Sequence, residues 1–400
     1  MSGLPWPMTI VLAVWLLAGL VLEAVLAWRQ WCHLARVEPG REPAATHCRR
    51  IRYGQRRALF QWLASAETVL RVAVWLGGGL SLLARAVTPD GWLSGVVFVA
   101  LFAAVDQLLG QPLRWGRWWA VERAFGTSRL DAAGMARDGL ASGGLAVLLA
   151  TLAAAWTLWP FGLLPVAVAW PLCGLLAIAA ALAYFWARPN LIAPLFNRFT
   201  SLPAGALRQR LAAMMDRSGA HLSDVRIMDG SRRSTLANAY FAGVGRSKRI
   251  VLLDTLMEQL PPAEIEAVLA HELGHFRCGH LKRYYGLLFG LILAAVSLLP
   301  LLLSAAGMQA APAVMAVALF VLLPALAWPL RPLLSALKRR YEYEADAFAA
   351  RHAEPAALVS ALRRLLAHNL NAPTMDRWYA AFHATHPPGD ERLSRLRCYM

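Results

Sequence analysis

Charged residues are scarce in this 400-residue chain, at 16% of the sequence, and lysine is almost missing, with only Lys248, Lys282 and Lys338. Soluble domains carry roughly 25% charged residues, so this scarcity excludes an ordinary soluble protein of two or three domains. Cysteine is also rare. The five cysteines are scattered and no CxxC pair occurs, so no disulfide framework or paired-cysteine site is predicted.

Hydrophobic residues make up 58% of the chain, which also holds 16 tryptophans, a composition typical of a membrane protein. The formal net charge is +16. The arginines lie mostly beside the hydrophobic runs, as in loops that face the cytoplasm, so nucleic acid is not an expected partner. Richness in arginine and alanine indicates a GC-rich, bacterial genome, and hence the bacterial inner membrane as the location.

Seven apolar runs are long enough to cross a bilayer core, which needs about 20 residues. They are Met8–Trp28, Ala66–Val87, Trp92–Gln111, Leu140–Trp159, Leu164–Trp186, Tyr284–Ala305 and Ala311–Leu330. The first and third connections are rich in arginine, whereas the even-numbered connections carry no lysine or arginine. This asymmetry places the first, third and fifth connections and the C-terminus in the cytoplasm.

Three charged residues, Glu23, Arg71 and Asp106, fall inside the predicted spans. Charge that faces lipid is costly, so these side chains are expected to pair or to face a wet interior, and a structural role is favoured over a catalytic one.

The fifth connection, residues 187–283, is the one large polar segment. Its pattern predicts a helix at Ala204–Arg217, a strand at Val225–Met228, and a hairpin of Ala239–Val244 and Arg249–Leu253 with its turn at GRSK. A further helix begins near Pro262 and carries the sequence HELGH. Together with the spans, this predicts an all-α integral membrane protein with a small cytoplasmic α+β portion.

His271, Glu272 and His275 form the motif HExxH. Residues four apart on a helix lie about 400° round, so both imidazoles can reach one zinc ion. Glu272 lies beside the metal and is suited to take a proton from water, as a general base. His280 is about 900° beyond His271 on a continuing helix, hence on its opposite side, and is read as structural.

A third zinc ligand is expected from the sequence YEYEADAF, beyond the seventh span. Glu342 and Asp346 are four apart on a predicted helix, so one carboxylate can bind the ion while the other orients a ligand from behind. The spacing alone leaves open which does which, and a pair of surface charges is the plain alternative. Glu344 is expected to point elsewhere, into solvent.

Motifs in order along most of the chain resemble the seven-span zinc proteases of the CAAX prenyl protease family. They are WWAVERAFGTSRL, RPNLIAPLFNRFTSLP, GSRRSTLANAYFAGVGRSKRIVLLDTL, AVLAHELGHFRCGH, YEYEADAFA and HATHPPGDERLSRL. The resemblance implies one Zn²⁺ per chain, bound by His271, His275 and Glu342, with Glu272 as the base. It also implies that the seven helices enclose a water-filled chamber, which would let water reach a metal beside the membrane.

Further roles rest on the same resemblance. It implies that Asn238 and His386 hold the substrate on either side of the metal, that Asp346 supports a ligand, and that Arg392 lies near the site. A turn residue and a loop imidazole are the plain alternatives for Asn238 and His386.

The predicted function is a membrane-embedded zinc metalloendopeptidase that acts on membrane-associated or lipid-modified, CAAX-type peptides. Its partners are such a peptide or protein and membrane lipid. The alternatives are a quality-control protease resembling HtpX, or a transporter or receptor with a structural zinc. The expected organisation is a five-span membrane region (1–187), a catalytic segment (188–283), two further spans (284–337) and a cytoplasmic C-terminal segment that supplies the third ligand (338–400).

Overall fold

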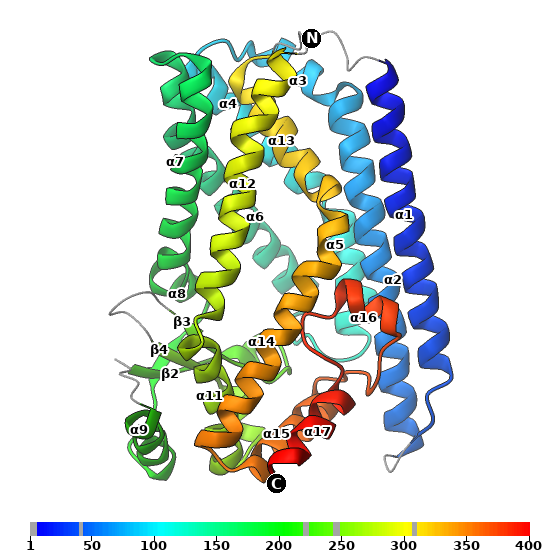
Figure 1. Cartoon of the computed structure of the whole chain (residues 1–400), viewed down its shortest axis with the longest axis vertical. Coiled ribbons are helices and arrows are strands. Elements are labelled where there is room, and N and C mark those ends of the chain that lie inside the picture. Colours follow the sequence, from blue (N-terminus) through cyan, green and yellow to red (C-terminus); the bar gives the residue numbers. More distant parts are fainter. Residues whose placement is uncertain (1–5, 40–42, 219–223, 243–248, 306–309) are drawn as a thin grey trace.

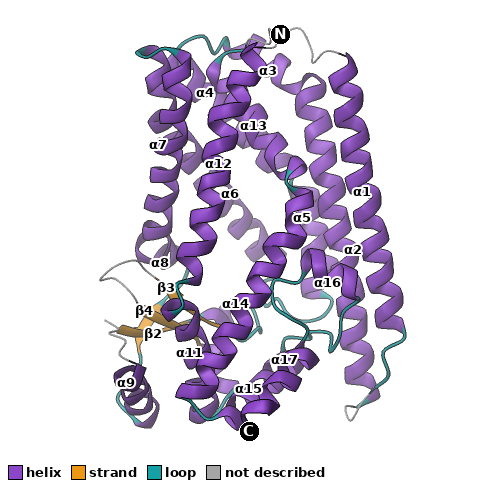
Figure 2. Cartoon of the chain, viewed as in Figure 1, coloured by secondary structure: helices purple, strands orange, loops and turns teal. Residues whose placement is uncertain are grey.

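Long helices run side by side along one axis of the molecule, and a smaller part with strands and short helices gathers at one end, beside the C-terminus (Figures 1 and 2). The computed structural model describes residues 6–39, 43–218, 224–242, 249–305 and 310–400.

Six helical segments in the described residues are long and apolar enough to cross a membrane, and a pair of helices bent by 43° supplies a seventh. The six segments are α1 (Trp6–Ala35), α2 with α3 (Ala44–Val74 and Leu80–Val87), α4 with α5 (Trp92–Leu109 and Gln111–Arg117), α6 (Ala132–Leu158), α7 with α8 (Val166–Ala187 and Ala193–Phe196) and α12 (His280–Ala305). The bent pair is α13 (Pro312–Leu326) and α14 (Arg331–His352). Each predicted apolar run falls in one of these segments, so the all-helical, seven-span prediction is confirmed.

The charged residues inside the spans are paired. Arg71 places Nη1 2.6 Å from Asp106 Oδ2 and Nη2 2.7 Å from Glu67 Oε1. Glu23 Oε1 lies 2.5 Å from Nη1 of Arg331 at the start of α14. Pairing lowers the cost of charge at membrane depth, in agreement with the structural role that the sequence favoured.

A four-stranded sheet in the order β1-β2-β4-β3 supports the polar end. The strands are β1 (Phe199–Ser201), β2 (Asp224–Met228), β3 (Ala239–Ala242) and β4 (Arg249–Leu253). β2 and β4 are parallel, whereas β1 and β3 run antiparallel to their neighbours. Among the described strands β3 is therefore an edge strand. The predicted turn GRSK and the end of the predicted strand at Val244 lie outside the described residues.

Helix α11 (Pro262–Arg277) forms the centre of the polar part. Its apolar residues, such as Leu269 and Leu273, are fully buried in one core with Ile250 and Leu252 of β4. α11 packs against β3, α9 (Ala206–Ser218), α14 and α15 (Pro355–His368). Because the helix is enclosed on several sides, its direction and rotation are fixed by packing.

Gly279 ends this helix, with φ at +69°, a left-handed conformation that glycine adopts without strain. The chain then turns directly into α12, which begins at His280. The remaining short helices are α10 (Asp254–Gln259), α16 (Arg377–His383) and α17 (Gly389–Leu396). In Figure 1, α15, α16 and α17 lie beside the lower half of α14.

Candidate active site

Helix α11 presents His271 and His275 on one face, one turn apart. Their Nε2 atoms lie 3.2 Å apart, and the His271 side chain is buried. The i, i+4 spacing explains this arrangement, because residues so spaced stack on one side of a helix.

Helix α14 brings Glu342 to the same point. Its Oε1 lies 3.2 Å from His275 Nε2, and its Oε2 lies 3.5 Å from His271 Nε2. The close approach of the two helices depends on Gly274. A Cβ at that position would lie 2.9 Å from Ala345 Cα and 3.1 Å from Ala345 O.

The donor set of His271, His275 and Glu342 fits a metal ion. The donor atoms all lie within 4.8 Å of one another. For zinc at 2.0–2.1 Å from its ligands, the edges of a tetrahedron are about 3.3–3.4 Å, close to the separations of 3.2–3.5 Å between the donors. Glu342 Oε2 is buried and makes no hydrogen bond of good geometry within the described part of the chain, although His386 Nδ1 lies 2.7 Å and Arg392 Nη1 3.3 Å from it.

Glu272 follows His271 on α11 and lies beside the donor set. Burial raises the pKa of its carboxyl above the ordinary value, while the neighbouring imidazoles of His271 and His275 lower it. A carboxylate with a raised pKa accepts a proton more readily near neutral pH, which suits a general base.

Asp346 lies behind His271, as the second carboxylate of the predicted pair. Its Oδ1 is 2.8 Å from His271 Nδ1, on the side of the ring away from the donor set. Arg392 of α17 holds this carboxylate from the other side, with Nε at 2.9 Å from Oδ2 and Nη2 at 2.6 Å from Oδ1. Such an arrangement orients an imidazole and fixes the position of its proton.

His386 reaches the site from the loop before α17. Its Nδ1 lies 2.7 Å from Glu342 Oε2, and its side chain is 67% exposed, so it is open to a ligand from solvent. Asn238 directly precedes the edge strand β3, and its backbone oxygen accepts a hydrogen bond from Leu253 N at 3.1 Å. Within the described residues, no hydrogen bond or ion pair joins the Asn238 side chain to the three donors.

The sequence placed His280 on the wrong side of the helix. His280 is 98% buried and contacts the site, with Nδ1 at 3.0 Å from Nδ1 of His275. The helical extrapolation failed because Gly279 breaks the helix and folds His280 back. Glu344 lies outside the donor set, as expected, but it is not fully in solvent: its side chain is 32% exposed and its Oε2 lies 3.0 Å from His280 Nε2. A glycine directly after the last turn of a helix is the signal that could have found this reversal.

Sequence reasoning also missed Asn369, which follows α15. Its side-chain amide donates to Ala237 O at 3.1 Å and accepts from Ala237 N at 3.0 Å. This pair of hydrogen bonds holds the backbone immediately before Asn238. No local motif marks it, because the two partners are 132 positions apart.

Comparison with known proteins identifies the family to which the chain is similar. Residues 201–399 match peptidase family M48, and residues 41–198 match the CAAX prenyl protease N-terminal region of five membrane helices. The chain is 30% identical over 322 residues to CAAX prenyl protease 1 of Saccharomyces cerevisiae, covering 75% of this chain and 71% of the yeast protein.

A rice relative, named CAAX prenyl protease 1 homolog, is 37% identical over 217 residues, and the match covers 52% of this chain. The chain spans about half the length of the rice and Arabidopsis relatives, at 51% of each. The crystal structure of Ste24p from S. mikatae superposes with a TM-score of 0.85 at 25% identity, covering 99% of this chain and 100% of that one.

The two family matches, the yeast relative and the shared architecture leave one conclusion: this integral, multi-pass membrane chain belongs to peptidase family M48, among the CAAX prenyl proteases.

Proposed function

We propose that this protein is a membrane-embedded zinc metalloendopeptidase that hydrolyses peptide bonds in membrane-associated or lipid-modified, CAAX-type peptides. One observation carries the proposal: two imidazoles and one carboxylate converge at 3.2–3.5 Å, with a second, protonatable carboxylate next to them on the same helix. A purely structural metal site needs the ligands but has no need of Glu272. The names of the relatives support the CAAX-type substrate.

In this proposal His271, His275 and Glu342 hold one zinc ion. Bound zinc supplies a Lewis acid that polarises water and a peptide carbonyl. Glu272 accepts a proton from the attacking water and delivers it to the leaving amine. Asp346, itself held by Arg392, keeps the His271 ring in the orientation and tautomer that bind the ion.

Asn238 and His386 bind the substrate on opposite sides of the scissile bond. Each can donate a hydrogen bond to a carbonyl oxygen as negative charge develops on it. The edge strand β3, next to Asn238, can pair with an extended peptide. Arg392 has its Nη1 3.3 Å from Glu342 Oε2, so it contributes positive charge beside the donors.

We further propose that the spans enclose a water-filled chamber, that the metal lies on the cytoplasmic side, and that the host membrane is the bacterial inner membrane. The proposed division of the chain is 1–187, 188–283, 284–337 and 338–400, with the last part supplying Glu342. This arrangement would let water and peptide meet the metal while lipid contacts only the outside of the helices.

The test compares Glu272→Gln with Glu258→Gln, a control on an exposed carboxylate of α10. Purified full-length enzyme in detergent is given a farnesylated CAAX peptide and the same peptide without the lipid. We expect Glu272→Gln to retain one zinc and lose about 10²- to 10⁴-fold in cleavage rate, the contribution of a general base. The control should match the wild type. Full cleavage by zinc-loaded Glu272→Gln would remove Glu272 from the mechanism, and equal rates on both peptides would remove the lipid from substrate recognition.

A further inference from the structure

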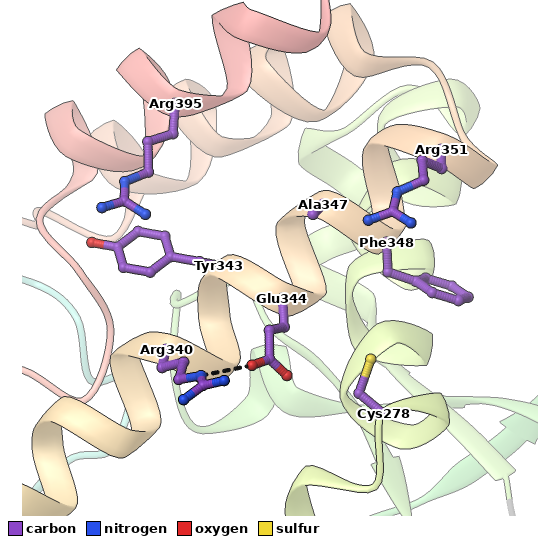
Figure 3. A pocket seen from close by; sticks show the side chains of 8 residues that line it. All are labelled: Cys278, Arg340, Tyr343, Glu344, Ala347, Phe348, Arg351 and Arg395. Atoms are coloured by element: carbon purple, nitrogen blue, oxygen red, sulfur yellow. Dashed lines mark hydrogen bonds and ion pairs between the residues drawn. The ribbon is translucent and has the colours of Figure 1, made fainter.

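Both candidate histidine ligands are supported from behind, but by different means. His271 is held by a carboxylate, Asp346, that is paired with an arginine. His275 is held instead by a second imidazole, with Nδ1 of the two rings 3.0 Å apart. His280 in turn places Nε2 3.0 Å from Glu344 Oε2. Arg340 donates from Nε to Glu344 Oε1 at 3.0 Å. The dashed line in Figure 3 marks this contact between Arg340 and Glu344.

The proton positions along these contacts, which run from His275 through His280 to Glu344, follow from the role of His275. An imidazole that offers the Nε2 lone pair to a metal carries its proton on Nδ1. His275 then donates from Nδ1, so His280 must accept at Nδ1 and keep its own proton on Nε2. That proton points to the Glu344 carboxylate, which can only accept. Among neutral tautomers, this is the one arrangement in which every short contact of the chain is a hydrogen bond.

The surroundings of His280 hold the ring in that orientation. The residue is 2% exposed, and its ring stacks on Tyr341 with centroids 4.2 Å apart and planes 10° apart. The left-handed turn at Gly279 brings it back toward α11. Tyr341 and Glu344 both belong to α14, the helix that carries Glu342. One helix therefore supplies the donor Glu342 and also fixes His280, the partner of the donor His275.

We propose that His280 and Glu344 are positioning residues for His275: they fix its tautomer and ring orientation, and so set the affinity of the site for zinc. This inference rests on the proposed function, because it assumes that His275 binds the metal. It adds a second carboxylate-backed support, distinct from the one formed by Asp346 and Arg392.

The same side chains suggest a rival reading. Cys278, His280 and Glu344 offer donor atoms within 4.8 Å of one another, beside a cavity of about 440 Å³. A metal there would need the Nε2 lone pair of His280, so the His280 proton would move to Nδ1. There it would face the proton on His275 Nδ1, and the hydrogen bond between the two rings would be lost. Three arginines (Arg340, Arg351 and Arg395) also line the cavity and repel a cation (Figure 3).

The experiment measures zinc affinity by chelator competition and zinc stoichiometry by mass spectrometry, on the purified full chain in detergent. His280→Phe keeps an aromatic ring to stack on Tyr341 but removes both hydrogen bonds. We expect it to bind zinc about 10- to 100-fold more weakly, the usual effect of removing the partner of a ligating histidine. His280→Asn retains an acceptor near the place of Nδ1 and should recover part of the loss. Glu344→Gln should lose affinity by less than His280→Phe.

Two controls separate positioning from general damage. The unfolding temperature of each metal-free variant is compared with that of the metal-free wild type, since a positioning role predicts little change there. The absorption spectrum of the cobalt-substituted enzyme reports the geometry at the ion, and it should change in His280→Phe. If His280→Phe does not fold, Glu344→Gln carries the same test, because the Glu344 side chain is 32% exposed and its replacement disturbs the core less.

Cys278→Ser is the matched variant for the rival reading and should leave zinc affinity and stoichiometry unchanged. Wild-type affinity in His280→Phe, or in Glu344→Gln where it must replace that variant, would overturn the proposal. So would two zinc ions in the wild type that fall to one in Cys278→Ser. If the wild type binds zinc and the Glu272→Gln variant keeps full activity, the proposed function alone is contradicted. The zinc affinities would still test the role of His280.

Discussion

The contact between α11 and α14 at Gly274 gives a sharp test of how the site is assembled. Replacing Gly274 by alanine adds a single methyl group on the face of α11 that packs against α14. Its nearest neighbours are backbone atoms, Ala345 Cα at 2.9 Å and Ala345 O at 3.1 Å, with Phe348 Cβ also at 3.1 Å. Backbone atoms within a helix cannot turn aside as the end of a flexible side chain can.

The size of the effect follows from these distances. Carbon atoms in contact prefer about 3.5–4.0 Å, so α14 must withdraw by roughly 0.6–1.1 Å. Metal sites tolerate donor shifts of only about 0.2 Å. Overpacking of this kind costs about 1–3 kcal/mol. The higher helix propensity of alanine, about 1 kcal/mol, favours the metal-free and zinc-bound forms alike and cancels in the affinity. The metal-free protein can relax by parting the helices, but the zinc-bound protein must keep them together. Zinc should therefore bind about 5- to 150-fold more weakly, since 1.4 kcal/mol corresponds to a factor of ten.

The assay is chelator competition for zinc, together with thermal unfolding of the metal-free protein. Gly286→Ala in α12 is the matched control, because nothing lies within 4 Å of a Cβ there. The control should keep wild-type zinc affinity. If Gly274→Ala also binds zinc as tightly as the wild type, the close approach of α11 and α14 does not determine the geometry of the donors, and the reasoning fails.

Substitutions at three other positions test separate contacts. Asp346→Asn should weaken zinc binding about 10- to 100-fold by disturbing the support of His271, and unchanged affinity in the chelator assay would contradict that support. Asn369→Ala leaves the backbone N–H and C=O of Ala237 without their partner, so the unfolding free energy in denaturant should fall by about 1–3 kcal/mol. Asn369→Asp should fall between Asn369→Ala and the wild type, and equal stability of all three would refute the role. Burial raises the pKa of Asp376, but the hydrogen bonds from Arg29 and from the first amides of α16 hold it below its usual value. The stability that Asp376 adds is therefore present above about pH 4 and lost as the pH falls further, so Asp376→Asn should flatten the acid side of a plot of unfolding temperature against pH.

Local rules explain what could be predicted from the sequence. Hydropathy located all seven spans, because a membrane-crossing helix must be apolar along its whole length and needs no partner to be recognised. The strand Arg249–Leu253 and the start of α11 at Pro262 were located in the same way, since β-branched runs and a proline in the first turn act over a few residues. The spacing of His271 and His275 placed both imidazoles on one face for the same reason.

Contacts between distant segments were beyond such rules. Glu342 and Asp346 are equivalent in spacing, and only the crossing of α14 over α11 sets one beside both imidazoles and the other behind His271. His280 was misplaced because one residue with a positive φ cancels a helical extrapolation. The clamp of Asn369 on the backbone of Ala237, just before Asn238, joins segments with no common pattern. Periodicity determines which faces a helix offers, because it acts along one element. Which faces meet depends on how whole elements pack, and that is decided by side chains far apart in the sequence.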